Sequence, residues 1–262
     1  MADVVTPIDL QTALADKVAA GGRCLVPYVT CGLDGWVDAV RAAVDAGADA
    51  VELGIPFSDP VMDGTTIQAA SELALRAGAE PPSLIAEAAG LDVGVPLAVM
   101  TYYNIAFRMG HERFARSLVA SGISGAILPD LPLDEVGPWA SVADEIGVAT
   151  VMLVAPTSPD ERIVRIAARA RGFVYAVGLL GVTGERAELA TSARLIAARA
   201  RAVASIPVLV GVGVSTPAQA VEVCEDADGV VVGSAVVRRL MEDGPAGVAE
   251  VVGDFRRALD AG

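Results

Sequence analysis

The sequence predicts an α/β protein in which parallel strands and helices alternate. Along its 262 residues, short runs rich in Val, Ile and Leu are followed by helical stretches from one end to the other. Turns that contain glycine end several helices directly before the next strand, as at Ala46-Gly47, Ser121-Gly122 and Ile146-Gly147. About eight such strand–helix units in one chain of this length are typical of a TIM (β/α)8 barrel, which is the fold we expect.

The predicted strands are short apolar runs bounded by glycine or proline. They span Cys24–Thr30, Ala48–Gly54, Pro96–Tyr102, Gly125–Pro129, Ala149–Ala155, Gly172–Val177, Pro207–Val212 and Gly229–Gly233. Nearly continuous hydrophobic runs of this kind are expected where a parallel sheet is covered on both faces.

The predicted helices carry apolar residues on one face. Those with a clear pattern span Ile8–Ala20, Gly35–Ala46, Glu112–Ala120 and Asp160–Ala170. The first is an extra N-terminal helix, which we expect to cap the bottom of the barrel. An open doubly wound sheet is the alternative, but it usually carries a glycine-rich turn after its first strand, and the turn Thr30–Gly35 does not fit. We see no linker or change of composition, so we predict a single domain over residues 1–262.

Composition and charge exclude several classes of function. The formal net charge of −14 argues against binding to nucleic acid and to anionic membrane surfaces. No signal peptide and no stretch of about 20 uninterrupted apolar residues is seen. Cys24, Cys31 and Cys224 have no metal-ligand spacing and read as small buried side chains, which fits a reducing cytoplasm. We expect no metal and no cofactor.

Two carboxylates mark the candidate catalytic site. Glu52 interrupts an apolar strand, and Asp63 follows eleven positions later on the loop before Gly64. A carboxylate within such a strand is costly unless it is paired or meets water at a mouth. Desolvation should raise the pKa of Glu52 toward neutrality, as an acid/base requires, whereas Asp63 in a wetter loop should stay charged.

The last two predicted strands carry the glycines of a candidate phosphate site. Gly211–Pro217 follows the seventh strand, and Val230–Ala235 spans the eighth strand and its loop. In TIM barrels the loops after these strands often bind phosphate through backbone N–H groups. The alternative is that the glycines serve only tight turns. A third segment with glycines, Tyr175–Glu185, is long enough to be a lid over the site.

Several segments in order resemble the alpha subunit of tryptophan synthase. They are Val26–Thr30, Glu52–Gln68, Tyr102–Asn104, Pro129–Pro132, Gly181–Gly184, Gly211–Ser215 and Gly233-Ser234. The most specific is Glu52-Leu53-Gly54-Ile55-Pro56-Phe57-Ser58-Asp59-Pro60, together with Asp63-Gly64. This resemblance implies a TIM barrel and a carbon–carbon lyase of L-tryptophan biosynthesis, which cleaves indole-3-glycerol phosphate to indole and glyceraldehyde 3-phosphate.

The resemblance also implies the role of each site residue. Glu52 would be the general acid/base, and Asp63 would accept a hydrogen bond from the indole N–H. Thr183 on the lid would contact Asp63, and Tyr175 would line the site near Glu52. The phosphate would be bound by Gly184, Gly213, Gly233 and Ser234. The indole pocket would be formed by Tyr28, Tyr102, Ile127 and Leu153.

A partner is implied as well, a pyridoxal-phosphate beta subunit in an alpha2-beta2 heterotetramer. Its interface on this chain would include Asp59, Pro60, Asn104 and Pro132. The chain itself offers no Schiff-base lysine for that cofactor, because its only lysine, Lys17, lies in the opening helix. Two features depart from the family: Tyr28 stands where Phe is common, and Gly178-Leu179-Leu180 replaces more polar lid residues.

Other functions stay open at this point. The chain could be a non-catalytic barrel that binds a phosphate ligand and regulates a partner enzyme, or another phosphate-binding barrel enzyme such as a sugar-phosphate isomerase. His111, the only histidine, is expected at the surface or at a helix cap. Asp130 is expected to make either a structural hydrogen bond or a partner contact. The arginines of Arg194–Arg201 are expected on a solvated helix face.

Overall fold

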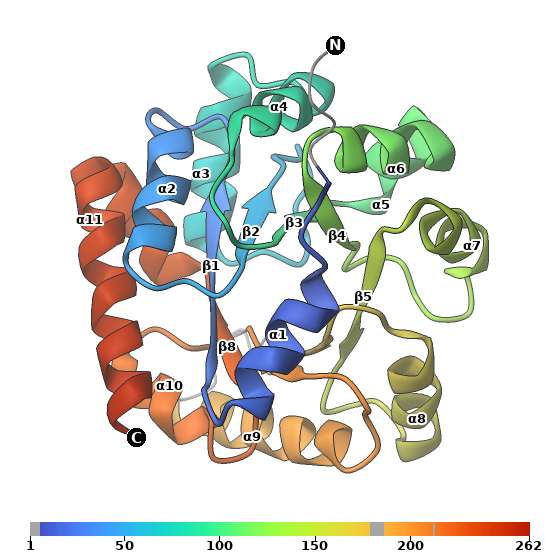
Figure 1. The fold of residues 1–262 in the computed structure, drawn as a ribbon, viewed down its shortest axis with the longest axis vertical. Helices are drawn as coiled ribbons and strands as arrows, with labels where there is room; N and C mark the ends of the chain where they lie inside the picture. The colour runs from blue at the N-terminus through green and yellow to red at the C-terminus, as the bar shows by residue number, and fades with distance from the viewer. Residues whose placement is uncertain (1–5, 179–185, 212) are drawn as a thin grey trace.

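The strands of this chain close into a barrel in chain order (Figure 1). The computed structural model describes residues 6–178, 186–211 and 213–262. Each strand pairs in parallel with the next one, and β8 pairs with β1 to close the ring. The strands are β1 Cys24–Thr30, β2 Val51–Gly54, β3 Leu97–Met100, β4 Ile123–Ile127, β5 Ala149–Val154, β6 Val174–Ala176, β7 Val208–Val210 and β8 Gly229–Val232. The predicted TIM barrel is confirmed.

Helices surround the barrel, and those predicted from the sequence are found within about two residues of their expected ends. They are α1 Leu10–Ala19, α2 Trp36–Asp45, α3 Thr65–Arg76, α4 Pro81–Glu87, the 3-10 turn η1 Ala88–Gly90, α5 Tyr103–Met109, α6 His111–Ala120, α7 Gly137–Ile146, α8 Asp160–Arg169, α9 Arg186–Arg201, α10 Pro217–Val223 and α11 Ser234–Ala261. The last is kinked at Gly244, whose φ of 65° is not helical and which precedes Pro245. None of the described helices has the length and apolar character that a membrane span requires.

Helix α1 closes the N-terminal end of the barrel, as predicted. It begins after Asp9, whose side chain accepts a hydrogen bond from the N–H of Thr12 at 2.7 Å. Leu10 and Leu14 of this helix, which Figure 1 shows lying across the barrel, are fully buried and pack against side chains of the barrel strands. A Cβ at Gly125 of β4 would lie 2.6 Å from Leu10 Cδ2, so a larger residue there would displace the Leu10 side chain. Because α1 plugs this end, the barrel interior formed by the described residues opens toward the C-terminal ends of the strands.

Asp49 joins distant parts of the chain at the same end of the barrel. Its carboxylate accepts a hydrogen bond from the N–H of Leu25 at 2.8 Å and pairs with Arg256 at 3.1 Å. It also pairs with Lys17 at 3.0 Å, so the only lysine of the chain has a structural contact in α1. Asp49 therefore fastens α1, β1 and α11 to one another.

The arginine-rich helix α9 does more than present a solvated face, and that prediction was incomplete. Arg194 pairs with Asp226 and Glu225, each at 2.6 Å, just beyond α10. Arg199 pairs with Asp160 at the start of α8 at 2.7 Å. These side chains join α9 to the elements on both sides of it.

Candidate active site

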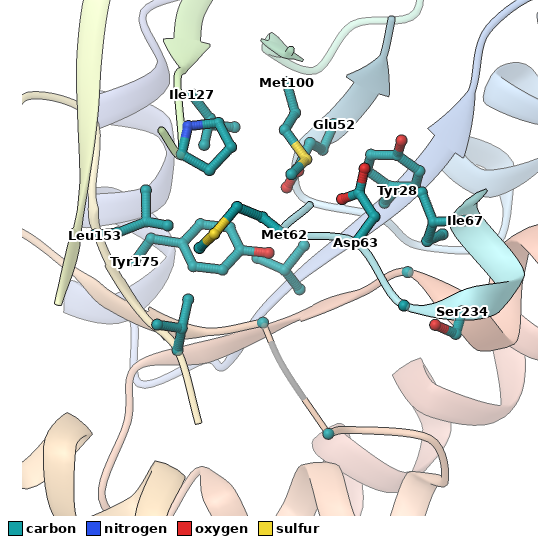
Figure 2. A pocket seen from close by; sticks show the side chains of 17 residues that line it. Tyr28, Glu52, Met62, Asp63, Ile67, Met100, Ile127, Leu153, Tyr175 and Ser234 are labelled. Carbon is teal, nitrogen blue, oxygen red and sulfur yellow. The ribbon is translucent and has the colours of Figure 1, made fainter. Parts of the chain in front are cut away.

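A cavity of about 170 Å³ opens at the C-terminal ends of the strands (Figure 2). It brings together the predicted residues Glu52, Asp63, Tyr175, Tyr28, Ile127, Leu153, Gly213, Gly233 and Ser234. The sequence analysis missed other lining residues, chiefly the apolar side chains of Met62, Ile67 and Met100. Residues from seven of the strands, and glycines from the loop after the remaining strand, β7, thus meet at one mouth, as the fold requires of an active site.

Glu52 extends from β2 into this mouth. Its side chain is only 1% exposed, and neither carboxyl oxygen has a hydrogen-bond partner among the described residues. Burial, and then the nearby charge of Asp63, raises the pKa of Glu52 from 4.5 to about 8. The carboxyl group is therefore mostly protonated at neutral pH and can act as a proton donor.

Asp63 lies beside it, on the loop between β2 and α3. Its Oδ2 accepts a hydrogen bond from the Tyr102 hydroxyl at 3.3 Å, and that hydroxyl accepts one from the N–H of Met62 at 2.8 Å. The side-chain amide of Gln68 donates to the Asp63 carbonyl oxygen at 2.8 Å, which holds the loop in place. Burial raises the pKa of Asp63 to about 6, and the bond from Tyr102 limits that rise. At neutral pH Asp63 is therefore mostly ionised while Glu52 is mostly neutral.

Tyr102 contacts Asp63 but does not itself line the cavity. It is buried, and its ring stacks on Phe57 with 4.9 Å between ring centroids. The cavity is lined without it. Its hydroxyl joins the end of β3 to the loop that carries Asp63, and so it positions that carboxylate.

Two tyrosines stand over two glycines in the same geometry. In the sheet register Tyr28 of β1 lies opposite Glu52, and its hydroxyl reaches Gly54, where a Cβ would lie 1.9 Å away. Tyr175 of β6 lies opposite Leu209, and its hydroxyl reaches Gly211, where a Cβ would lie 2.0 Å away. In each case the glycine is two residues beyond the register partner on the next strand. Neither pair could be predicted from the sequence, because both depend on strand register.

The phosphate end of the cavity is built mainly from backbone. β8 ends at Val232, and Gly233 directly precedes α11, which begins at Ser234, so the unpaired N–H groups of the first helical turn border the cavity. Gly213 has a φ of 91°, a conformation that favours glycine. The N–H of Ser215 is already bonded to the Gln219 side chain at 2.9 Å. No lysine or arginine lines the described cavity, so an anion there would be bound by dipoles and a hydroxyl.

Some predicted residues lie outside the cavity or outside the described structure. Thr183 and Gly184, and with them residues 179–185 of the predicted lid segment Tyr175–Glu185, fall outside the described residues. The predicted interface residues Asp59, Asn104 and Pro132 are exposed and Pro60 is half-buried.

Asp130 and His111 have structural partners. Asp130 accepts a hydrogen bond from the N–H of Tyr103 at 2.8 Å, which supports the structural alternative for this residue. His111 begins α6, with its Nε2 3.0 Å from the Tyr103 hydroxyl. In the part of the chain that the structure describes, no group of three or more His, Cys, Asp or Glu side chains could hold a metal ion.

The sequence is similar to known proteins over nearly its whole length. The family described as "Tryptophan synthase alpha chain" matches residues 14–256. The tryptophan synthase alpha chain of Streptomyces coelicolor is 45% identical over 256 residues, which cover 96% of this chain and 94% of that protein. The tryptophan synthase alpha chain of Thermobifida fusca is 41% identical over 261 residues, which cover 97% of each.

Solved structures agree with the sequence similarity. A structure of tryptophan synthase from Mycobacterium tuberculosis has a TM-score of 0.89 to this chain at 38% identity, and covers 98% of this chain and 100% of that one. The tryptophan synthase subunit alpha of Legionella pneumophila has a TM-score of 0.85 at 30% identity, with 97% and 99% covered. The similarity therefore includes every strand of the barrel and the loop that carries Asp63.

Proposed function

Because the chain belongs to the tryptophan synthase alpha chain family, we propose that its barrel mouth carries out the alpha reaction. That reaction is the retro-aldol cleavage of indole-3-glycerol phosphate to indole and glyceraldehyde 3-phosphate, so the chain acts as a carbon–carbon lyase. The observation that carries this proposal is the pairing of two carboxyl groups with opposite ionisation. Glu52 has a pKa of about 8 and Asp63 one of about 6 in the same cavity.

Glu52 is suited to move both protons of the reaction. Its neutral carboxyl donates a proton to C3 of the indole ring, and C3 becomes tetrahedral while positive charge forms at the ring nitrogen. The resulting carboxylate then takes the proton of the hydroxyl on the adjacent carbon. The bond between that carbon and C3 breaks, its electrons restore the aromatic ring, and the alkoxide becomes the aldehyde. Glu52 ends as it began, protonated.

Asp63 supplies the charge that this intermediate requires. Its ionised carboxylate accepts a hydrogen bond from the indole N–H and stabilises the positive charge that develops on the ring nitrogen. The cavity is largely buried, so water screens this interaction only weakly. Tyr102 fixes the carboxylate on one side at 3.3 Å. The phosphate lies at the other end, on the first turn of α11 with Ser234 and the backbone of Gly213.

We further propose that the chain works with a pyridoxal-phosphate beta subunit, in an alpha2-beta2 assembly in the cytoplasm. The residues assigned to that interface, Asp59, Asn104 and Pro132, are exposed and free to meet a partner. Asp59 and Pro132 lie on the loops after β2 and β4, and Asn104 lies in the first turn of α5 after β3, at the same end of the barrel as the cavity. The buried free thiols of Cys24, Cys31 and Cys224 fit a reducing compartment.

The test is to incubate the pure chain with indole-3-glycerol phosphate and to measure indole. Glu52→Gln keeps the shape and removes the proton, so turnover should fall by at least about a hundredfold while ligand binding persists. Asp63→Asn should lower kcat strongly through loss of the charge. The matched control is Glu112→Gln, since that carboxylate is exposed and pairs with Arg116.

Each assignment has an outcome that contradicts it. Near-normal turnover in Glu52→Gln would remove that residue from the mechanism. A change in KM alone for Asp63→Asn would contradict charge stabilisation. If the wild-type chain bound phosphate ligands but released no indole, the non-catalytic regulatory barrel would be the better description.

A further inference from the structure

Tyr28 spans the cavity from its phosphate end to its carboxyl end. The side chain is 7% exposed and lines the cavity (Figure 2). Its Cβ lies 3.8 Å from the position of a Cβ at Gly233, beside the start of α11. Its hydroxyl lies over Gly54 at the end of β2, two residues beyond Glu52. A ligand that joins the two ends of the cavity must therefore run along this ring.

The Tyr28 hydroxyl is a hydrogen-bond donor throughout the working pH range. Burial is the largest cause that holds the pKa of this phenol well above 10. The negative charge of Asp63 and then that of Glu52 add to the rise, and the hydroxyl of Thr30 opposes part of it. Asp63 is thus the charged group that acts most strongly on Tyr28, and the phenol keeps its proton beside it.

The proposed substrate has one polar group to which no residue has yet been assigned, and this step rests on the proposed function. The phosphate is bound at α11, the indole N–H at Asp63, and the reacting hydroxyl at Glu52. The hydroxyl on the middle carbon of the glycerol chain remains. That carbon lies between the phosphate-bearing carbon and the reacting carbon. A buried hydroxyl without a partner is costly, so a donor or acceptor is expected beside it.

We propose that the Tyr28 hydroxyl binds the hydroxyl on the middle carbon of the substrate and makes the site select a hydroxylated chain over a bare propyl chain. Tyr28 is then a specificity-determining residue, because a side chain without its hydroxyl could not make this bond. Tyr175 is the competing candidate. Its hydroxyl lies over Gly211 after β7, on the side of the barrel opposite β2.

The experiment uses two ligands that differ by this one hydroxyl. They are 3-(indol-3-yl)propyl phosphate and its 2-hydroxy derivative in the configuration of the substrate. Neither can be cleaved, because neither carries a hydroxyl on the chain carbon that is bonded to C3 of the indole ring. Isothermal titration calorimetry measures the affinity of both for the wild-type chain, for Tyr28→Phe, and for Tyr175→Phe as the matched control. Each variant removes one buried hydroxyl from a tyrosine that stands over a glycine.

The wild-type chain should bind the hydroxylated ligand about fivefold more tightly, as one hydrogen bond in a dry site provides. Tyr28→Phe should lose that preference and bind the bare ligand within about twofold of wild type, whereas Tyr175→Phe should keep the preference. The inference is overturned if the wild type shows no preference, if the preference survives Tyr28→Phe, or if it disappears in Tyr175→Phe. Indole release by the wild type is measured in parallel. Its absence would contradict the proposed function, whereas its presence without the Tyr28 effect would contradict this inference alone.

Discussion

Replacing Glu52 by glutamine should stabilise the fold, and the gain should depend on pH. The pKa of Glu52 is 4.5 when the side chain is free in water and about 8 in the folded chain. Because the folded pKa is the higher one, the unfolded state loses the proton first as pH rises. The contribution of this group to stability is complete below pH 4.5 and is lost progressively up to pH 8.

The size of the effect follows from this interval. Each pH unit between the two pKa values costs the wild type about 1.4 kcal/mol of unfolding free energy. At pH 7 the buried carboxyl group therefore costs about 3 kcal/mol relative to pH 4.5, and glutamine, which does not titrate, avoids this cost. A change of about 3 kcal/mol is large for any domain, since the total free energy of unfolding is typically about 5–15 kcal/mol.

The assay is urea unfolding of wild type and Glu52→Gln at pH 5, 6, 7 and 8, followed by circular dichroism. The difference between the two unfolding free energies should grow with pH and level off near pH 8. Its absolute value at any one pH also contains the burial of the amide, so the slope is the quantity to compare. Glu112→Gln is the control, because that side chain is 69% exposed and its difference from wild type should stay nearly constant. A difference for Glu52→Gln that does not change with pH would refute the raised pKa.

Three further changes test other parts of the site. Gly54→Ala should lower the unfolding free energy by about 1–3 kcal/mol, because the new Cβ would lie 1.9 Å from the Tyr28 hydroxyl. Gly90→Ala is the control and should leave the unfolding free energy unchanged, because no atom lies within 4 Å of its Cβ position. Equal urea midpoints for the two variants would contradict the packing argument. Tyr102→Phe removes the hydrogen bond that limits the pKa of Asp63, so the acidic limb of the pH profile of kcat/KM should move to higher pH. An unchanged acidic limb would show that Tyr102 does not set the pKa of Asp63. Gly213→Val should weaken binding of glycerol 3-phosphate roughly tenfold in a titration, because valine disfavours a φ of 91°, and unchanged affinity would place the phosphate elsewhere.

The fold could be predicted because its strands are buried on both faces and so read as plain apolar runs. The first strand has the predicted bounds, Cys24–Thr30. The second was predicted from Ala48 but begins at Val51. The difference has a physical reason, since the Asp49 side chain bonds to the N–H of Leu25 and to Arg256, and the chain before Val51 serves as a connection.

The sequence predicted those site residues whose own side-chain chemistry makes them stand out, but not the contacts between them. Glu52 is conspicuous because it interrupts an apolar strand, and desolvation is the largest cause of the higher pKa of this more buried carboxyl group. The bond between Tyr102 and Asp63 joins residues 39 positions apart and depends on how β3 stands beside the loop after β2. The Tyr28–Gly54 pair depends on register between neighbouring strands, which apolar patterning does not give for strands buried on both faces.

The seam between the first and the last strand decides when this protein can finish folding. Asp49 meets Arg256 across 207 positions of sequence, and the Arg23 carbonyl meets the same guanidinium across 233. During synthesis, β1 therefore has an unpaired edge until β8 and α11 have left the ribosome. Contacts of such long range form slowly, because a long loop must close before they repay its entropy. The active site inherits this order, since Tyr28 stands on the first strand and Ser234 directly follows the last: the two sides of the cavity come together only when the barrel closes.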